Sequence, residues 1–66
     1  MKLIVNGDQI DFDNISSVDD LANSLKIGKE GSAIELNGEI TKQRDWSSLR
    51  LKDGDRLEMI TFVGGG

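Results

Sequence analysis

The residues with the clearest potential for chemistry lie at the C-terminal end, where Gly64, Gly65 and Gly66 precede the terminal carboxylate. Glycine has no Cβ, so a flexible tail of three glycines could pass through a channel too narrow for any side chain. The carboxylate of Gly66 is ionised at neutral pH and could attack the α-phosphate of an ATP molecule held by another protein. That reaction would give an activated acyl adenylate. The competing interpretation is a frayed chain end without a role.

The remaining candidates for chemistry have simpler structural interpretations. Asp53 and Asp55 flank Gly54 but lack the further oxygen ligands of a calcium loop, so a turn is expected there. Asp19 and Asp20 fall in the first turn of a predicted helix, where the helix dipole favours negative charge. The chain has no cysteine and no histidine, which excludes disulfides, thiolate or imidazole catalysis and metal sites built from those ligands. We therefore expect no metal and no intrinsically bound cofactor.

Length and charge limit the class of protein. Sixty-six residues form one domain at most, with too small a core to enclose a roomy active site. Twelve acidic against eight basic residues give a net charge of −4, and a phosphate backbone would repel such a surface. The apolar run of residues 3–5 is far too short for a signal peptide or a membrane span. These features predict a cytoplasmic protein that is monomeric when free and binds neither nucleic acid nor membrane.

The hydrophobic pattern predicts two hairpins and one helix. Residues 3–5 and 9–13 predict strands joined at Asn6-Gly7, a dipeptide typical of the type I′ turn, and residues 34–36 predict a second hairpin turning at Asn37-Gly38. Ser17, followed three residues later by Asp20, predicts a capped amphipathic helix that ends at Gly28. A short turn or 3₁₀ segment is expected around Trp46, Leu49 and Leu51, with apolar side chains over an open end of the core.

The last strand, expected over residues 56–63, decides the fold class. It can lie beside the first strand, parallel to it and in the centre of the sheet, because a helix intervenes between them. The prediction is an α+β fold of the β-grasp type, a four- to five-stranded mixed sheet packed on one amphipathic helix. The domain would span residues 1–63, and residues 64–66 would form the tail. The expected core residues are Leu3, Val5, Phe12, Val18, Leu21, Leu25, Ile34, Leu36, Leu57 and Met59.

The two faces of the last strand are both partly apolar. Alternation places Leu57 and Met59 on one face, and Ile60 and Phe62 on the other. The helix can cover only one face, so Ile60 and Phe62 are predicted to form an exposed apolar patch that contacts a partner. The alternative is that Ile60 and Phe62 are ordinary isolated apolar residues on the surface and bind no partner.

The sequence LKDGDRLEMITFVGGG, from Leu51 to Gly66, resembles the closing signature of the ThiS-like sulfur carriers of the thiamine pathway. The likeness extends over nearly the whole chain, through the opening MKLIVNG, the SVDDLANSL helix and the AIELNGEI hairpin. It implies a ubiquitin-like β-grasp fold in the superfamily that also contains the molybdopterin carrier MoaD. It also implies that the chain is a protein cosubstrate rather than an enzyme.

The resemblance implies a reaction sequence at Gly66. A ThiF-like activating enzyme that uses ATP and magnesium would adenylate Gly66, and a cysteine desulfurase relay would supply sulfur to convert it to a thiocarboxylate. The thiocarboxylate would donate its sulfur to a ThiG-like thiazole synthase. Gly64 and Gly65 would thread into the partners, and Ile60, Phe62 and Val63 would dock against them.

Three other functions remain open at this point. The small subunit of molybdopterin synthase shares the fold, the tail and the thiocarboxylate chemistry, and fold alone does not separate it from a thiamine carrier. A ubiquitin-like protein modifier would end in an isopeptide bond to lysine. A non-catalytic interaction module would leave the tail without a role.

Overall fold

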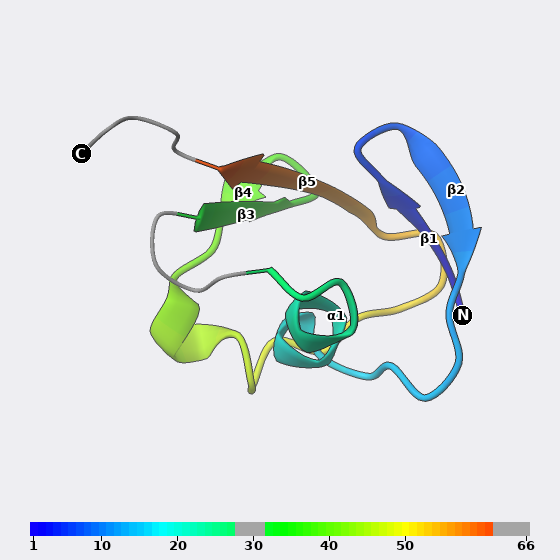
Figure 1. The fold of residues 1–66 in the computed structure, drawn as a ribbon, viewed down its shortest axis with the longest axis horizontal. Coiled ribbons are helices and arrows are strands. Elements are labelled where there is room, and N and C mark those ends of the chain that lie inside the picture. Colours follow the sequence, from blue (N-terminus) through cyan, green and yellow to red (C-terminus); the bar gives the residue numbers. More distant parts are fainter. Residues whose placement is uncertain (28–31, 62–66) are drawn as a thin grey trace.

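The computed structural model describes residues 1–27 and 32–61, which form a five-stranded mixed sheet, one α-helix and a short 3₁₀ helix. The sheet order is β2-β1-β5-β3-β4, and α1 lies against one face of the sheet (Figure 1). The elements are β1 (Lys2–Val5), β2 (Asp8–Asp11), α1 (Val18–Ser24), β3 (Ser32–Leu36), β4 (Glu39–Ile40), η1 (Gln43–Asp45) and β5 (Arg56–Thr61). β5 is central and parallel to β1, which confirms the predicted β-grasp arrangement.

Both hairpins turn where the Asn-Gly dipeptides predict. Asn6 and Gly7 have φ values of 50° and 86°, and Asn37 and Gly38 have values of 52° and 89°. Positive φ at both central residues is the requirement of a type I′ turn, whose twist matches that of the flanking strands. The turns therefore set the register of both hairpins, with Val5 opposite Asp8 and Leu36 opposite Glu39.

The N-terminus of α1 is a complete capping box. The Ser17 side chain accepts a hydrogen bond from the Asp20 backbone N–H at 3.1 Å, and the Asp20 carboxylate accepts one from the Ser17 backbone N–H at 3.1 Å. The same carboxylate oxygen also accepts hydrogen bonds from the backbone N–H and hydroxyl of Ser16, at 3.0 and 2.9 Å. Hydrogen bonds to an ionised carboxylate favour its charged form. The Ser16 backbone N–H, followed by the Ser16 hydroxyl, therefore holds the pKa of Asp20 below its ordinary value.

This lowered pKa predicts a pH dependence of folding. A carboxyl group with a lower pKa in the folded state contributes stability that is fully present above its unfolded pKa of about 3.9. The contribution is lost as the pH falls through the folded pKa. Asp20→Asn should therefore flatten the acid limb of a plot of urea midpoint against pH. If the acid limb of Asp20→Asn is as steep as that of the wild type, other carboxylates cause the loss of stability at low pH.

The helix ends earlier than predicted. α1 stops at Ser24, four residues before Gly28, which lies outside the described residues. Lys26 takes the left-handed conformation that glycine usually takes at this position, with φ of 56°. The N–H of Ile27 donates to the Ala22 carbonyl at 2.9 Å and that of Lys26 donates to the Asn23 carbonyl at 3.1 Å. These two hydrogen bonds form a Schellman motif, which terminates the helix despite the unfavourable residue type.

Lys26→Gly should stabilise the domain, because glycine removes the steric cost of a Cβ at positive φ. That cost is roughly 1 to 2 kcal/mol, and the greater freedom of glycine in the unfolded chain offsets part of it. We expect a net gain of about 0.5 to 1 kcal/mol in the free energy of unfolding, measured by urea denaturation. Lys26→Ala keeps the Cβ and is the matched control, with no comparable gain expected. Equal gains for both variants would refute the backbone explanation.

The core lies between α1 and the sheet and extends beneath η1. Six predicted core residues are buried, and Phe12, Leu36 and Met59 are partly buried against them. The six are Leu3, Val5, Val18, Leu21, Ile34 and Leu57. Leu25 was wrongly assigned to the core: it is the residue that caps the helix end, and its exposed fraction is 37%. Ala22, Trp46 and Leu51 are also buried.

Trp46 contributes more to the core than its expected place over an open end suggested. It follows η1, a 3₁₀ helix at the start of the segment predicted to be a short turn or a 3₁₀ piece, and only 1% of its surface is exposed. Its indole Nε1–H donates to the Thr41 hydroxyl at 2.9 Å, and that hydroxyl donates to the Ile34 carbonyl at 2.7 Å. The indole is therefore held in place by a chain of hydrogen bonds that leads to β3. None of the helices in the described part of the chain is long and apolar enough to span a membrane.

Candidate functional site

The candidate site is the C-terminal half of β5 and the sheet face around it. β5 lies between β1 and β3, so the chain reaches its C-terminal segment from the middle of the sheet (Figure 1). β3 pairs with β5 along five consecutive positions, from Ser32 opposite Thr61 to Leu36 opposite Leu57. This pairing makes β5 a rigid base for the residues that follow it.

On its other side, β5 extends beyond β1. The two strands pair only at Ile4 with Arg56 and at Val5 with Leu57. Asn6 continues the hydrogen bonding by one step, because its backbone N–H donates to the Leu57 carbonyl at 2.9 Å and its side-chain Oδ1 accepts from the Met59 N–H at 2.8 Å. Sequence analysis identified Asn6 as a turn residue but did not reveal this second role, because the contact spans 53 positions in the chain.

Ile60 lies on the sheet face opposite α1, as predicted. It is directly opposite Ala33 in the register, and residues that oppose each other across a ladder share a face. Leu57 is buried on the other face, under the helix, and Met59 is partly buried there. Ile60 is half-buried rather than fully exposed, because β3 flanks it. Phe62, Val63, Gly64, Gly65 and Gly66, the other predicted site residues, lie outside the described residues.

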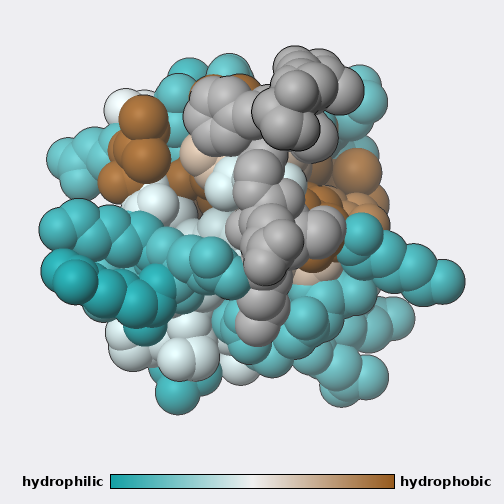
Figure 2. All heavy atoms as spheres, turned by 60° about the vertical axis from the view of Figure 1, so that its left-hand side comes forward, coloured by the Kyte–Doolittle hydropathy of each residue, from teal (hydrophilic) through white to brown (hydrophobic). Residues whose placement is uncertain are grey.

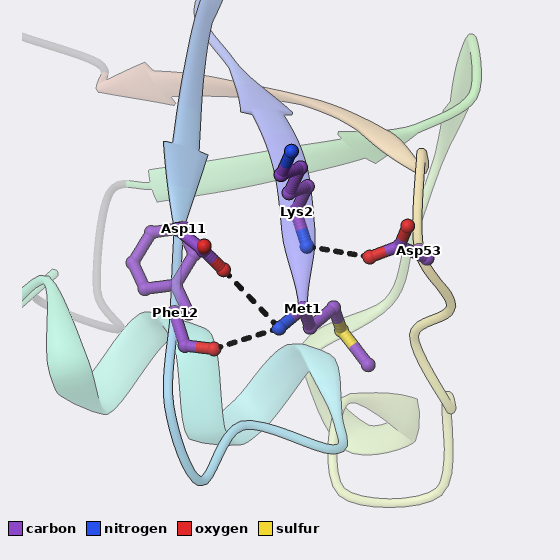
Figure 3. Close-up of polar contacts among 5 residues, drawn as sticks. All are labelled: Met1, Lys2, Asp11, Phe12 and Asp53. Carbon is purple, nitrogen blue, oxygen red and sulfur yellow. Dashed lines mark hydrogen bonds and ion pairs between the residues drawn. The ribbon is translucent and has the colours of Figure 1, made fainter.

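Asp53 and Asp55 have structural roles, which supports the turn interpretation of this segment. The Asp53 carboxylate accepts a hydrogen bond from the Lys2 backbone N–H at 2.6 Å, next to the chain start, where the amino group of Met1 contacts Asp11 and the Phe12 carbonyl (Figure 3). Gly54 has φ of 90°, and its N–H donates to the Lys2 carbonyl at 2.7 Å. The turn before β5 is thus attached to the start of β1.

Asp55 is buried, and its carboxylate accepts hydrogen bonds from two separate segments of the chain. Its carboxylate accepts hydrogen bonds from the Lys52 backbone N–H at 2.9 Å and from the Asn37 side chain at 3.0 Å. Asn37 in turn accepts from the Arg56 N–H at 3.0 Å, so the second hairpin turn is attached to the start of β5. These contacts use the oxygens that a metal would need. Among residues 1–27 and 32–61 no group of three potential metal ligands converges.

A shallow hollow of about 260 Å³ lies between β4 and η1. Its lining is mixed, with apolar Leu36, Ile40 and Leu49 beside Glu39, Lys42 and Asp45. No nucleophile is paired with a general base there, so the geometry offers no catalytic arrangement of its own.

The comparisons with known proteins agree with this architecture. The model of the ThiS family matches residues 3–66. The crystal structure of a thiamine biosynthesis protein (ThiS) from Geobacter metallireducens superposes with a TM-score of 0.83, at 38% sequence identity, with all of both chains covered. The uncharacterized protein ycf40 of Porphyra purpurea is 36% identical over 66 residues, which are all of this chain and 93% of that protein.

Another relative is much longer than this chain. A thiazole synthase of Paramagnetospirillum magneticum is 35% identical over 66 residues, but this chain spans only 20% of its length. The match to the family model covers almost every residue, and the likeness to the Geobacter protein extends to the full fold. This chain therefore belongs to the ThiS family, whose members are small sulfur carriers rather than catalysts.

Proposed function

We propose that this chain carries sulfur for thiazole formation in thiamine biosynthesis, with Gly66 as the residue that bears the sulfur. The observation that supports this most strongly is the run of three glycines that follows central strand β5 in a chain matching the ThiS family over residues 3–66. A small domain without a catalytic arrangement in its described part suits a cosubstrate, which brings one reactive group to enzymes that supply the rest of the chemistry.

The proposed chemistry has three steps. A Gly66 carboxylate oxygen attacks the α-phosphorus of ATP on an activating enzyme, and pyrophosphate leaves. A desulfurase takes the sulfur from cysteine as an enzyme persulfide, and a thiol reductant, which becomes a disulfide, reduces that sulfur to the sulfide level. The sulfide equivalent then attacks the acyl carbon, and AMP leaves with the electrons of the broken C–O bond. The resulting thiocarboxylate is a nucleophile that transfers its sulfur to the acceptor enzyme. Magnesium and ATP act on the activating enzyme, and this chain supplies the carboxylate.

Thiazole synthase is the proposed acceptor. The Paramagnetospirillum thiazole synthase contains a segment that matches all 66 residues of this chain, so that protein joins a carrier-like segment to a much longer remainder. Two proteins that act on one intermediate gain effective concentration when they are linked. The same arrangement in Magnetococcus marinus, at 26% identity, supports the pairing.

The experiment that tests the proposal is an intact-mass measurement. The purified chain is incubated with ATP, magnesium, an activating enzyme, a cysteine desulfurase, cysteine and a thiol reductant. The expected result is replacement of one terminal oxygen by sulfur, located at Gly66 by fragmentation, with no change when ATP is omitted. An unchanged mass in the complete mixture would refute the carrier role. Conjugates through lysine would instead indicate a protein modifier, and sulfur transfer only to a molybdopterin synthase subunit would indicate the molybdopterin pathway.

Docking through Ile60, Phe62 and Val63 is part of the proposal. Replacing both Ile60 and Phe62 by Ala should weaken binding to the activating enzyme at least tenfold, or about 1.4 kcal/mol, if the pair forms a central apolar anchor. Titration calorimetry measures the change. Ile10→Ala is the matched control, because Ile10 opposes buried Leu3 on the helix side of the sheet, with 37% of its surface exposed. Equal affinity of the double variant and the wild type would remove the patch from the mechanism.

A further inference from the structure

Two glutamates oppose each other near the centre of the sheet. Glu35 on β3 is directly opposite Glu58 on β5, between the rung that joins Ile34 to Met59 and the rung that joins Leu36 to Leu57. Those neighbouring rungs point into the core, so the two glutamates point to the face away from α1. Glu35 is half-buried and Glu58 is exposed.

This pairing works against folding. Side chains directly opposite in an antiparallel ladder have Cβ atoms roughly 5 Å apart, and like charges at such a pair are destabilising. Within the described part of the chain, neither carboxylate forms a hydrogen bond or an ion pair, and the ion pair that is present joins the amino group of Met1 to Asp11. Arg56, two positions before Glu58 on the same face, forms no ion pair with it. Neither glutamate charge is therefore paired with a cation within residues 1–27 and 32–61.

Apolar residues flank the two carboxylates on this face, where Arg56 also lies. Ile40 is opposite Glu35 on β4 and has an exposed fraction of 69%, and the rung of Ile60 and Ala33 lies on the same face. Figure 2, which brings the left-hand side of Figure 1 forward, shows a mostly hydrophilic surface with separate hydrophobic areas rather than one continuous apolar patch. Two carboxylates between isoleucines suit a guanidinium group, which donates to carboxylates in a planar fork while its alkyl stem packs on apolar side chains.

We propose that this sheet face docks a partner protein that places an arginine between Glu35 and Glu58, with apolar side chains against Ile40 and Ile60. Binding would then relieve a repulsion that the free chain retains. The inference rests on the proposed function only for the choice of partners to test. A second copy of this chain is a poor occupant, because it would bring the same two glutamates and a net charge of −4 to the contact.

The test uses the double variant E35Q/E58Q, which keeps the shape of both side chains and removes both charges. Its melting temperature should rise by about 1 to 8 °C, because the repulsion is gone. Its affinity for the activating enzyme or for thiazole synthase should fall at least tenfold in calorimetric titrations, and the difference from the wild type should shrink at high salt. Glu39→Gln is the matched control, since Glu39 is exposed but opposes Leu36 on the helix side. Its affinities should stay within about twofold of the wild type.

Higher stability together with weaker binding would support the proposal, because a merely structural pair would lose stability on substitution. Unchanged affinity for both enzymes would overturn it. An equal loss in Glu39→Gln would also overturn it, since general attraction to an acidic chain would then explain the effect. The sulfur-transfer assay on the wild type separates the failure of this inference from the failure of the carrier role. If the wild type acquires sulfur but E35Q/E58Q binds the enzymes as tightly as the wild type does, only the arginine contact is refuted. If the wild type acquires no sulfur, the carrier role is refuted.

Discussion

Adding one residue after Gly66 should abolish adenylation of this chain and leave its fold and partner binding intact. The added residue moves the carboxylate beyond the position from which it can attack the α-phosphate in line. Misplacement by about 1 Å can reduce a rate by about 10²-fold, and one added residue can move the group by up to about 3.6 Å. Pyrophosphate release by the activating enzyme measures the effect, and we expect a loss of at least 10²-fold.

Two further variants separate the effect of the carboxylate's position from the effect of side-chain width in the enzyme channel that the tail is proposed to enter. Gly65→Val keeps the carboxylate in register but adds a branched side chain and restricts φ, so it should also prevent activation. Gly65→Ala adds only a Cβ and should have an intermediate rate. All three variants should melt at the wild-type temperature, because the buried core of the described chain consists of residues between Leu3 and Leu57. Wild-type rates from the extended chain and from Gly65→Val would show that the glycine segment has no role in activation.

Trp46→Ala should be among the most destabilising substitutions in the domain. The side chain is buried and anchored by its hydrogen bond to Thr41, and its loss leaves a large cavity. Truncation of a buried tryptophan costs about 3 to 5 kcal/mol, whereas a chain of this length has a total stability of about 3 to 10 kcal/mol. Urea denaturation should be followed by circular dichroism, because Trp46 is the only tryptophan and the variant loses that fluorescence signal.

Two further substitutions test the reason for this effect. Trp46→Phe keeps much of the apolar volume but removes the indole donor, so a loss of about 1 to 3 kcal/mol is expected. Leu25→Ala changes a side chain that is 37% exposed at the helix end, and it should cost less than about 1 kcal/mol. A larger loss in Leu25→Ala than in Trp46→Ala would mean that the structure places these two side chains wrongly.

The parts of the fold that depend on neighbouring residues could be predicted from the sequence. The Asn-Gly dipeptides give type I′ turns at Asn6 and Asn37, and the spacing of Ser17 and Asp20 gives the capping box, because positive φ and helix capping are local requirements. The parallel position of β5 beside β1 could also be predicted, since the intervening helix permits that crossover. The proposed chemistry of Gly66 likewise depends on the last residues alone.

Only the tertiary structure decided the features that join distant segments. The helix ends at Ser24 because backbone hydrogen bonds in a Schellman motif hold Lys26 in a conformation that its residue type disfavours, so no local signal marked the end. Trp46 is buried because η1 folds under β3, which hydrophobic periodicity in its own segment does not reveal. Glu35 and Glu58 become neighbours only through the register of β3 with β5. Each strand's alternation assigns a glutamate to the outer face, but which residue opposes it depends on pairing across 23 positions of the chain, and a slip of one residue would change every partner.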